Sequence, residues 1–441
     1  MVQEDMSVLP SGPGPILLLI IGVIVAFACL FGAFRSLSRK RLIDDTPTSK
    51  TQGVFIGLAE LNGTAESEMP LTSYLSEIRC VQYEWEIEEQ WSRQVVETYR
   101  DADGKTQTRT RTESGWTNIG HGGESAPFYL RDDTGVIRVV PDYASIEGVT
   151  TISETLGRGD AMYFGKGSPY EVANSDHRRR FKETVIPLHS MLYVIGQARE
   201  RQDIVAAEIA HDNEAPLFVI STNVEKQISR SYGLWFLLWI TIGFISTVIG
   251  SVKLSPSLGM WSLVVPASLY LIAAALSWVW VVYNSLVSLR NSVDQAWSLV
   301  DVQLKRRSDL IPNLVSIVEG YQMHEEAIQV LTAELRAQAS TSAAGDQTEL
   351  KGVAPTLHAT TERYPELLAG ETFLRLQRSL VETEQRIALA RDYFNEIAFF
   401  YNTRLVVVPD MFVGKIAGLL SRPLLTAENF ERASVEVKLV T

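Results

Sequence analysis

Apolar residues recur at steps of three, four and seven along residues 283–330, the spacing that places side chains on one face of an α-helix. The pattern predicts one helix of about 50 residues, roughly 75 Å long at 1.5 Å per residue. It slips by one residue between Val300 and Leu304, which favours a helix bundle over a strict heptad seam. Because one helix cannot bury its own apolar face, a partner helix is required. Pro312 interrupts the pattern and predicts a bend or a joint.

A second periodic stretch supplies the partner, beginning at Glu371 and running to about Leu405, before Pro409 ends the helix. We expect a shorter helix over residues 412–420, so that residues 283–423 form an all-α bundle of long helices, followed by a tail, residues 424–441. The core face of the second helix is marked by apolar residues seven apart: Phe373, Leu380, Ile387, Phe394 and Tyr401.

Three apolar stretches, residues 16–34, 233–250 and 261–282, are close to the length that crosses a bilayer as a helix, about 20 residues. No Lys or Arg precedes the first stretch, which favours an anchor over a cleaved signal peptide. Basic residues follow the first stretch, precede the second and follow the third. Positive residues stay in the cytoplasm, so residues 1–15 are predicted outside and both larger soluble parts inside.

The period changes to two over residues 51–230. Val81, Tyr83, Trp85 and Ile87 alternate with polar residues, as in a half-buried strand. Turn residues at Asp103-Gly104 and across residues 132–135 predict two hairpins between short strands. We therefore predict a multi-domain membrane protein with three transmembrane helices, a small antiparallel β-rich (α+β) domain and the helical bundle.

Charge and residue usage exclude several functions. The net charge of -12 argues against a general nucleic-acid binder, because phosphate binding needs a basic surface. Two cysteines are too few for a cysteine-rich zinc module. His324-Glu325 resembles half of a zinc-protease motif, but Ile328 stands where the second histidine is needed. No catalytic residue, metal site or cofactor is predicted.

Two resemblances fit this division of the chain. The words YNSLV, DVQLKRR, DLIPNLV, YQMHEEA and TEQRIALARDYFN, within residues 283–423, resemble the LemA family, which implies a membrane-anchored helical bundle. The words GLAELNGTAE, IRCVQYEWEIEEQW and PFYLRDDTGVIRVVP resemble the GIDE-type domain of membrane-embedded ubiquitin ligases, which implies a β module beside the membrane. Those ligases carry a zinc RING after the second span. This chain has the LemA-like part there, so ligase activity is not carried over.

Polar residues on the two long helices form the candidate site. Their spacing of seven, four and seven on the second helix puts four side chains on one stripe, and the first helix offers three more at intervals of seven. One interpretation is a buried hydrogen-bonded network that fixes helix register, which we favour because buried polar groups are normally paired internally. The other is a groove for a peptide or a lipid head group. The seven residues are Asn284, Asn291, Ser298, Glu384, Arg391, Asn395 and Asn402.

A second candidate is the basic cluster Arg178, Arg179 and Arg180. It reads either as a solvated loop or as a contact for anionic lipid head groups, and the loop is favoured because electrostatic anchoring usually needs 4–8 basic residues.

Together these features predict a non-enzymatic protein of the bacterial inner membrane, a scaffold or signalling module that is homo-oligomeric. Its partners are membrane lipids and a protein of unknown identity, with no nucleic acid. The first alternative is a lipid- or peptide-binding sensor. The second, a ligase-like or hydrolytic enzyme, is disfavoured because the RING and the GxSxG elbow are missing.

Overall fold

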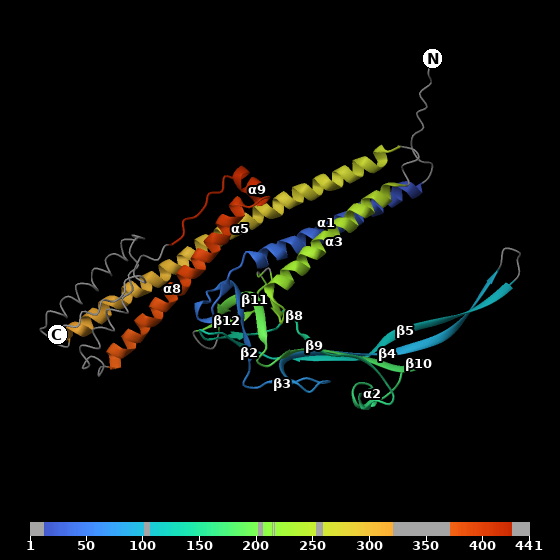
Figure 1. Cartoon of the computed structure of the whole chain (residues 1–441), viewed down its shortest axis with the longest axis horizontal. Helices are drawn as coiled ribbons and strands as arrows, with labels where there is room; N and C mark the ends of the chain where they lie inside the picture. Colours follow the sequence, from blue (N-terminus) through green and yellow to red (C-terminus); the bar gives the residue numbers. More distant parts are fainter. Residues whose placement is uncertain are drawn as a thin grey trace, which may run out of the picture. The chain divides into compact units, whose positions relative to one another are not determined.

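The computed structural model describes residues 13–100, 106–201, 206–213, 215, 217–252, 259–320 and 371–425. The chain divides into two compact units. The β unit is Thr48–Ile228, and the helical unit combines Met1–Pro47 with Ser229–Thr441. Figure 1 shows the helices and strands of both units.

The helical unit contains the long helices that the apolar spacing predicts. α5 continues through Pro312, so the joint expected at that proline does not end the helix. The part of the predicted helix beyond Gly320 lies outside the described residues. α9 is shorter than predicted and bends 91° away from α8. The helices of this unit are α1 (Pro13–Asp44), α3 (Glu225–Val252), α5 (Trp261–Gly320), α8 (Glu371–Val406) and α9 (Asp410–Ile416).

α5 and α8 pack along the predicted faces. On α8, Leu380, Ile387, Phe394 and Tyr401 are buried, while the side chain of Phe373 lies outside the described residues. The ring of Phe394 meets the α5 ring of Trp297 edge to face, at 5.6 Å between centroids.

The predicted slip in the α5 pattern is wrong. Burial follows strict steps of three and four from Leu286 to Val300 and then continues at Gln303 and Arg307, while Leu304 is only half-buried. The seam therefore keeps its heptad spacing by burying polar side chains instead of shifting to the next leucine.

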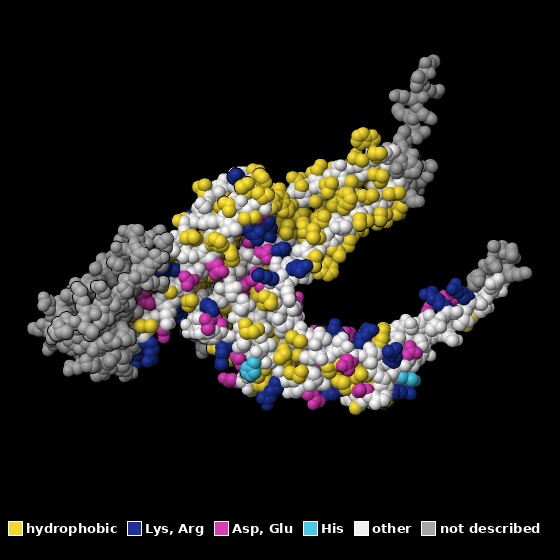
Figure 2. Space-filling model, in the orientation of Figure 1, with side chains coloured by type: hydrophobic (Ala, Val, Ile, Leu, Met, Phe, Trp, Pro, Cys, Tyr) yellow, Lys and Arg dark blue, Asp and Glu magenta, His cyan; other side chains and the backbone are white. Residues whose placement is uncertain are grey.

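α1, α3 and α5 are each long and apolar enough to cross a membrane, over Leu17–Asp44, Glu225–Val252 and Trp261–Leu310. Their outward side chains are largely hydrophobic, and charged side chains begin where that surface ends (Figure 2). α1 and α3 approach closely at two glycines, because a Cβ on Gly22 would lie 2.9 Å from a backbone oxygen of Ser246. Small residues permit such close packing between apolar helices.

The β unit is not wholly antiparallel, which corrects the predicted domain. One sheet has the order β1-β2-β6-β7-β12-β11-β13-β8, and a further β2–β11 pairing closes five of these strands into a ring. Three of its pairings, β1–β2, β7–β12 and β8–β13, are parallel. Its strands are β1 (Thr48–Ser49), β2 (Gly57–Glu66), β6 (Phe128–Arg131), β7 (Val136–Val139), β8 (Ser145–Glu147), β11 (Met191–Glu200), β12 (Ala207–Ala210) and β13 (Val219–Ser221).

The second sheet has the order β3-β4-β10-β9, with β5 paired to β4. β4 and β5 are far longer than the short strands predicted, and they pair from Gln82↔Ser125 to Arg100↔Thr106. The predicted Asp103-Gly104 turn lies outside the described residues, between these strands. The elements are β3 (Leu71–Thr72), β4 (Arg79–Arg100), β5 (Thr106–Ser125), β9 (Val149–Gly157) and β10 (Ser175–Pro187), with the short helices η1 (Thr51–Gly53) and α2 (Ala161–Gly165) elsewhere in the unit.

The predicted β6–β7 hairpin is confirmed, and Asp132 organises its turn. One carboxylate oxygen of Asp132 accepts hydrogen bonds from the Thr51 hydroxyl and from the backbone amides of Thr134 and Gly135, at 2.6–2.9 Å. The other accepts the Thr51 amide at 2.8 Å. Partial burial alone would raise the pKa of Asp132, but these bonds outweigh it and lower the pKa to about 2.

This pKa predicts a pH-dependent stability. Because the folded pKa lies below the unfolded value of about 3.9, the ionised carboxylate stabilises the fold above pH ~4 and that contribution disappears as the pH falls toward 2. Asp132→Asn should therefore lower the unfolding free energy by about 2 kcal/mol at pH 7 and have little effect at pH 2. Chemical denaturation of the full chain in detergent measures both values. An equal loss at the two pH values would contradict the assignment.

Candidate functional site

A partly buried cluster of charged side chains joins the end of α1 to α5, α8 and α9. The guanidinium of Arg41 donates two hydrogen bonds to the carboxylate of Asp410, at 2.9 and 2.7 Å. Both side chains are nearly inaccessible, with 9% of Arg41 and 4% of Asp410 exposed. Such a two-point pair fixes orientation as well as distance. It therefore locks the C-terminal end of α1 against the start of α9.

A second pair lies beside the first. Arg404, near the end of α8, donates to Asp45 at 2.8 Å, and the Ser285 hydroxyl of α5 donates to the other oxygen of Asp45 at 3.0 Å. Arg404 also lies 3.7 Å from the carboxylate of Asp410, so the two pairs form one network. Asp45 follows α1 directly in the chain. The network therefore ties all four helices at one level.

α3 is attached to the same level. Lys40 of α1 donates to the Ser229 hydroxyl of α3 at 3.0 Å and pairs with Asp44, which also accepts from Ser229. Three cations, Lys40, Arg41 and Arg404, therefore meet the three anions Asp44, Asp45 and Asp410. The cluster is neutral as a whole.

Burial raises the pKa of Asp45, although Arg404, Ser285 and Arg41 act to lower it. The desolvation of this carboxylate is thus only partly offset by its partners. A buried ion network of this kind gives little net stability compared with apolar packing, but removing one member is costly. The cluster therefore acts mainly to specify one arrangement of the five helices that it joins.

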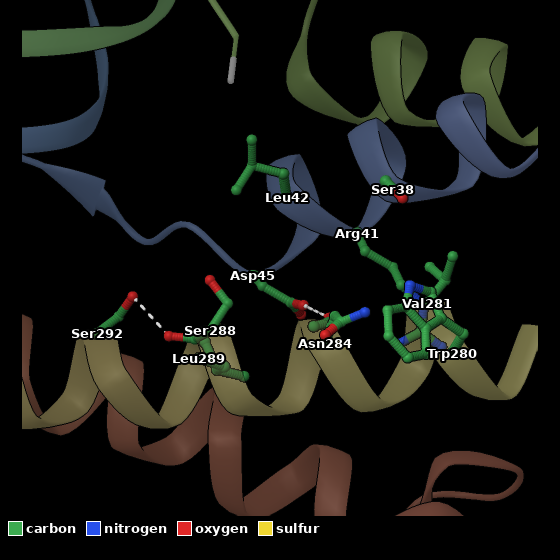
Figure 3. A pocket seen from close by; sticks show the side chains of 11 residues that line it. Ser38, Arg41, Leu42, Asp45, Trp280, Val281, Asn284, Ser288, Leu289 and Ser292 are labelled. Atoms are coloured by element: carbon green, nitrogen blue, oxygen red, sulfur yellow. Dashed lines mark hydrogen bonds between the residues drawn. The ribbon is translucent and has the colours of Figure 1, made fainter. Parts of the chain in front are cut away.

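A pocket of about 220 Å³ lies between the end of α1 and α5, beside the cluster. Figure 3 shows Arg41, Leu42 and Asp45 on one side of it and Asn284 and Ser288 of α5 on the other. Its remaining lining residues are Ser38, Trp280, Val281, Ser285, Leu289 and Ser292.

The predicted polar residues of α5 do not form a buried network. Asn284, Asn291 and Ser298 are all exposed. Asn284 lines the pocket, and the Ser298 hydroxyl donates to the backbone oxygen of Asp294 at 3.1 Å, within its own helix. Steps of seven placed these residues on one stripe, but that stripe is not the one that faces α8.

The predicted α8 stripe divides into separate contacts. Glu384 lies 3.5 Å from Arg307, whose side chain is 3% exposed, so this pair crosses the α5–α8 seam. Arg391 is half-buried, and its Nε is buried without a hydrogen-bond partner among the described residues. Neither of these side chains contacts Asn395 or Asn402 through a hydrogen bond within the described part of the chain.

Asn395 and Asn402 instead hold the chain's own C-terminal strap, which we define as residues 419–425. The Asn402 amide donates to the backbone oxygen of Arg422 at 2.7 Å and accepts from its backbone N–H at 2.8 Å. Asn395 does the same for Leu425, at 2.8 and 2.7 Å. The two asparagines therefore contact the backbone of a segment that belongs to no helix or strand.

The basic cluster is part of a strand, which corrects the predicted loop. Arg179 on β10 is fully buried and pairs with fully buried Glu89 at 3.0 Å, so it is not available to a lipid head group. Arg180 pairs with Glu88 at 3.0 Å and lies over the Trp116 ring. Arg178 is exposed.

The residues of the charge cluster were not predicted from the sequence. Lys40 and Arg41 follow an apolar stretch, as expected for charges that flank a membrane span. Because that position already accounted for the two charges, their pairing with aspartates was not predicted. The available signal was the acidic pair Asp44 and Asp45, which begins three residues after Arg41. Among the described residues, no group of three or more His, Cys, Asp or Glu side chains could hold a metal ion.

Comparison with known proteins confirms both resemblances. The LemA family matches residues 296–439, and the family described as E3 ubiquitin ligase (GIDE) matches residues 96–254. Each match covers about a third of the chain, and the two cover different parts of it.

Individual relatives are distant. Magnetosome protein MamQ of Magnetospirillum gryphiswaldense and magnetosome protein MamQ 1 of Paramagnetospirillum magneticum are each 24% identical over 167 residues. Those matches span 31% of this chain and 61% of each relative. Protein LemA of Metamycoplasma hominis is 22% identical over 159 residues, spanning 35% of this chain and 73% of that protein. No solved structure matches the chain.

Proposed function

We propose that this chain is a non-enzymatic scaffold of the bacterial inner membrane, which holds a LemA-like helical hairpin and a GIDE-like β unit in the cytoplasm. α1, α3 and α5 would span the bilayer, with the chain's N-terminus outside. Three apolar helices and the basic residues at their ends support this topology. Lipids and further copies of the chain are the proposed partners.

The observation that carries the proposal is the buried pair between Arg41 and Asp410. It lies just after the apolar part of α1, at the level where α5 leaves the apolar region. Because the pair is oriented at two points and buried, α8 and α9 are fixed relative to the spans and cannot swing freely. A rigid extension beyond the membrane suits the display or assembly of partners more than a chemical reaction.

The proposed topology predicts the behaviour of fusion proteins. Green fluorescent protein fused after Thr441 should fluoresce, and alkaline phosphatase at the same place should be inactive, because phosphatase folds only outside the cytoplasm. Phosphatase inserted in the connection between α3 and α5 provides the control and should be active. Active phosphatase after Thr441 would overturn the topology.

A peptide-binding function is the second candidate, and one specific observation favours it. The side chains of Asn395 and Asn402 each bind both backbone polar groups of one residue in a non-helical segment. The same protein can be a scaffold and bind such a segment at this face.

A further inference from the structure

The spacing of the two strap-binding asparagines, Asn395 and Asn402, can be compared with the spacing of the two strap residues that they bind. The asparagines are seven residues apart on α8, which is about 10.5 Å along a helix at 1.5 Å per residue. The two residues that they hold, Arg422 and Leu425, are three apart, which is about 10 Å in an extended chain. The two spacings match for a strap in an extended conformation, and both asparagines bind it at the same time.

Each asparagine side chain replaces one peptide group of a neighbouring strand. A side-chain amide has one carbonyl acceptor and an NH₂ donor, so it can satisfy both the N–H and the C=O of one residue. Residues in an antiparallel β pair exchange the same two bonds. α8 therefore offers, at two points, the hydrogen bonds that a sheet edge would offer.

The remaining strap contacts add a preference for charge. Arg422 donates to the carboxylate of Asp294 on α5 at 2.7 Å, so the site favours a basic residue at the first of the two positions. Leu419, at the start of the strap, packs beside the apolar cluster of Val282, Leu286 and Val413. None of these contacts requires that the strap and the helices belong to the same molecule.

We infer that this face of α8 binds the C-terminal strap of a second copy of the chain, so that two copies exchange straps. A second copy carries the identical segment, so the four asparagine hydrogen bonds and the Arg422–Asp294 pair can form between copies as they do within one. Exchange of an identical element is a low-cost route to a dimer. Gly418, between α9 and the strap, supplies the hinge and adopts a φ of 64°, which glycine tolerates.

This inference rests on the proposed homo-oligomeric scaffold, and confinement of both copies to one membrane raises the rate at which straps meet. Within one copy, a short linker also keeps its own strap at high effective concentration. The two arrangements therefore compete, and a test must disable the arrangement within one copy.

The test co-expresses two full-length copies with different tags. The first copy carries Asn395→Ala and Asn402→Ala, so that its own strap has no site, and a photoreactive benzoylphenylalanine replaces Leu424, which is 46% exposed. The second copy keeps its asparagines but carries Arg422→Pro and Leu425→Pro, which remove the two backbone donors of its strap. We expect light to join position 424 of the first copy to α8 of the second.

The matched control gives the second copy Asn395→Ala and Asn402→Ala as well, and the cross-link between copies should fall several-fold. A cross-link of equal yield in the control, or none in either case, would overturn strap exchange. Thermal melting followed by circular dichroism shows whether the variant with Asn395→Ala and Asn402→Ala is folded. If it is unfolded, the experiment uses Asn402→Ala alone in its place. Light scattering in detergent measures the oligomeric state separately and so distinguishes the scaffold proposal from strap exchange. If the chain is oligomeric but the straps do not cross-link, strap exchange is wrong and the homo-oligomeric scaffold still stands.

Discussion

Asp410→Asn is expected to lower the unfolding free energy of the helical unit by about 3–5 kcal/mol, because it leaves the buried guanidinium of Arg41 without its two-point carboxylate partner. Asparagine keeps the size of the side chain, so loss of charge and not a cavity is the cause. For a unit of this size the melting temperature should fall by on the order of 10 °C. Melting of the full chain in detergent, followed by circular dichroism, measures the change.

Asp301→Ala is the matched control. Asp301 is an exposed aspartate on α5, and its loss should change the unfolding free energy by no more than about 0.5 kcal/mol. A similar small effect at Asp410 would show that the pair does not hold α1 to α9.

Arg179→Met should be equally damaging in the β unit. Arg179 pairs with Glu89, and both side chains are 0% exposed. Its guanidinium also donates to the backbone oxygens of Ser168 and Tyr170, at 2.8 and 3.1 Å, and lies over the Tyr163 ring. Methionine fills part of the space but leaves a buried carboxylate unpaired, which costs about 3–5 kcal/mol. Tryptophan fluorescence during denaturation of the full chain reports this loss.

The neighbouring exposed arginine distinguishes a structural role from a lipid contact. Arg178→Met should leave stability unchanged, and flotation with anionic vesicles should not distinguish it from the unaltered chain. If Arg178→Met weakened vesicle binding while Arg179→Met left stability intact, the lipid interpretation of this cluster would be favoured instead.

The spacing of apolar residues predicted the long helices well, because the buried positions of a helix that packs on one side recur once per helical turn. α8 is described from Glu371 onward, because the residues before it lie outside the described part of the chain, and it ends at Val406, one residue beyond the prediction. The α5 register failed where a polar residue belonged to the buried face. Arg307 is buried because Glu384 lies opposite, and a residue so distant in the chain is invisible to local patterning. The pattern therefore chose Leu304, the nearest apolar residue.

The charge cluster was missed for the same physical reason. Arg41 and Asp410 are 369 residues apart in the chain, and the nearby acidic residues Asp44 and Asp45 do not indicate Asp410 as the partner. For Arg179 the signal in the sequence was more direct. Arg179, Phe181, Glu183 and Val185 alternate with exposed or half-buried residues along β10, as one buried face of a strand requires. The run of three arginines was interpreted by its charge, and the two-residue alternation of the strand was therefore missed.

One buried charge pair joins the end of α1 to the start of α9, and a double-mutant cycle measures this pairing. Unfolding free energies would be measured for the unaltered chain, Arg41→Met, Asp410→Asn and the double variant. The double variant should be far less damaged than the sum of the two single losses, with a coupling energy of at least about 2 kcal/mol. Losses that add to within about 0.5 kcal/mol would contradict this pairing, because independent sites add.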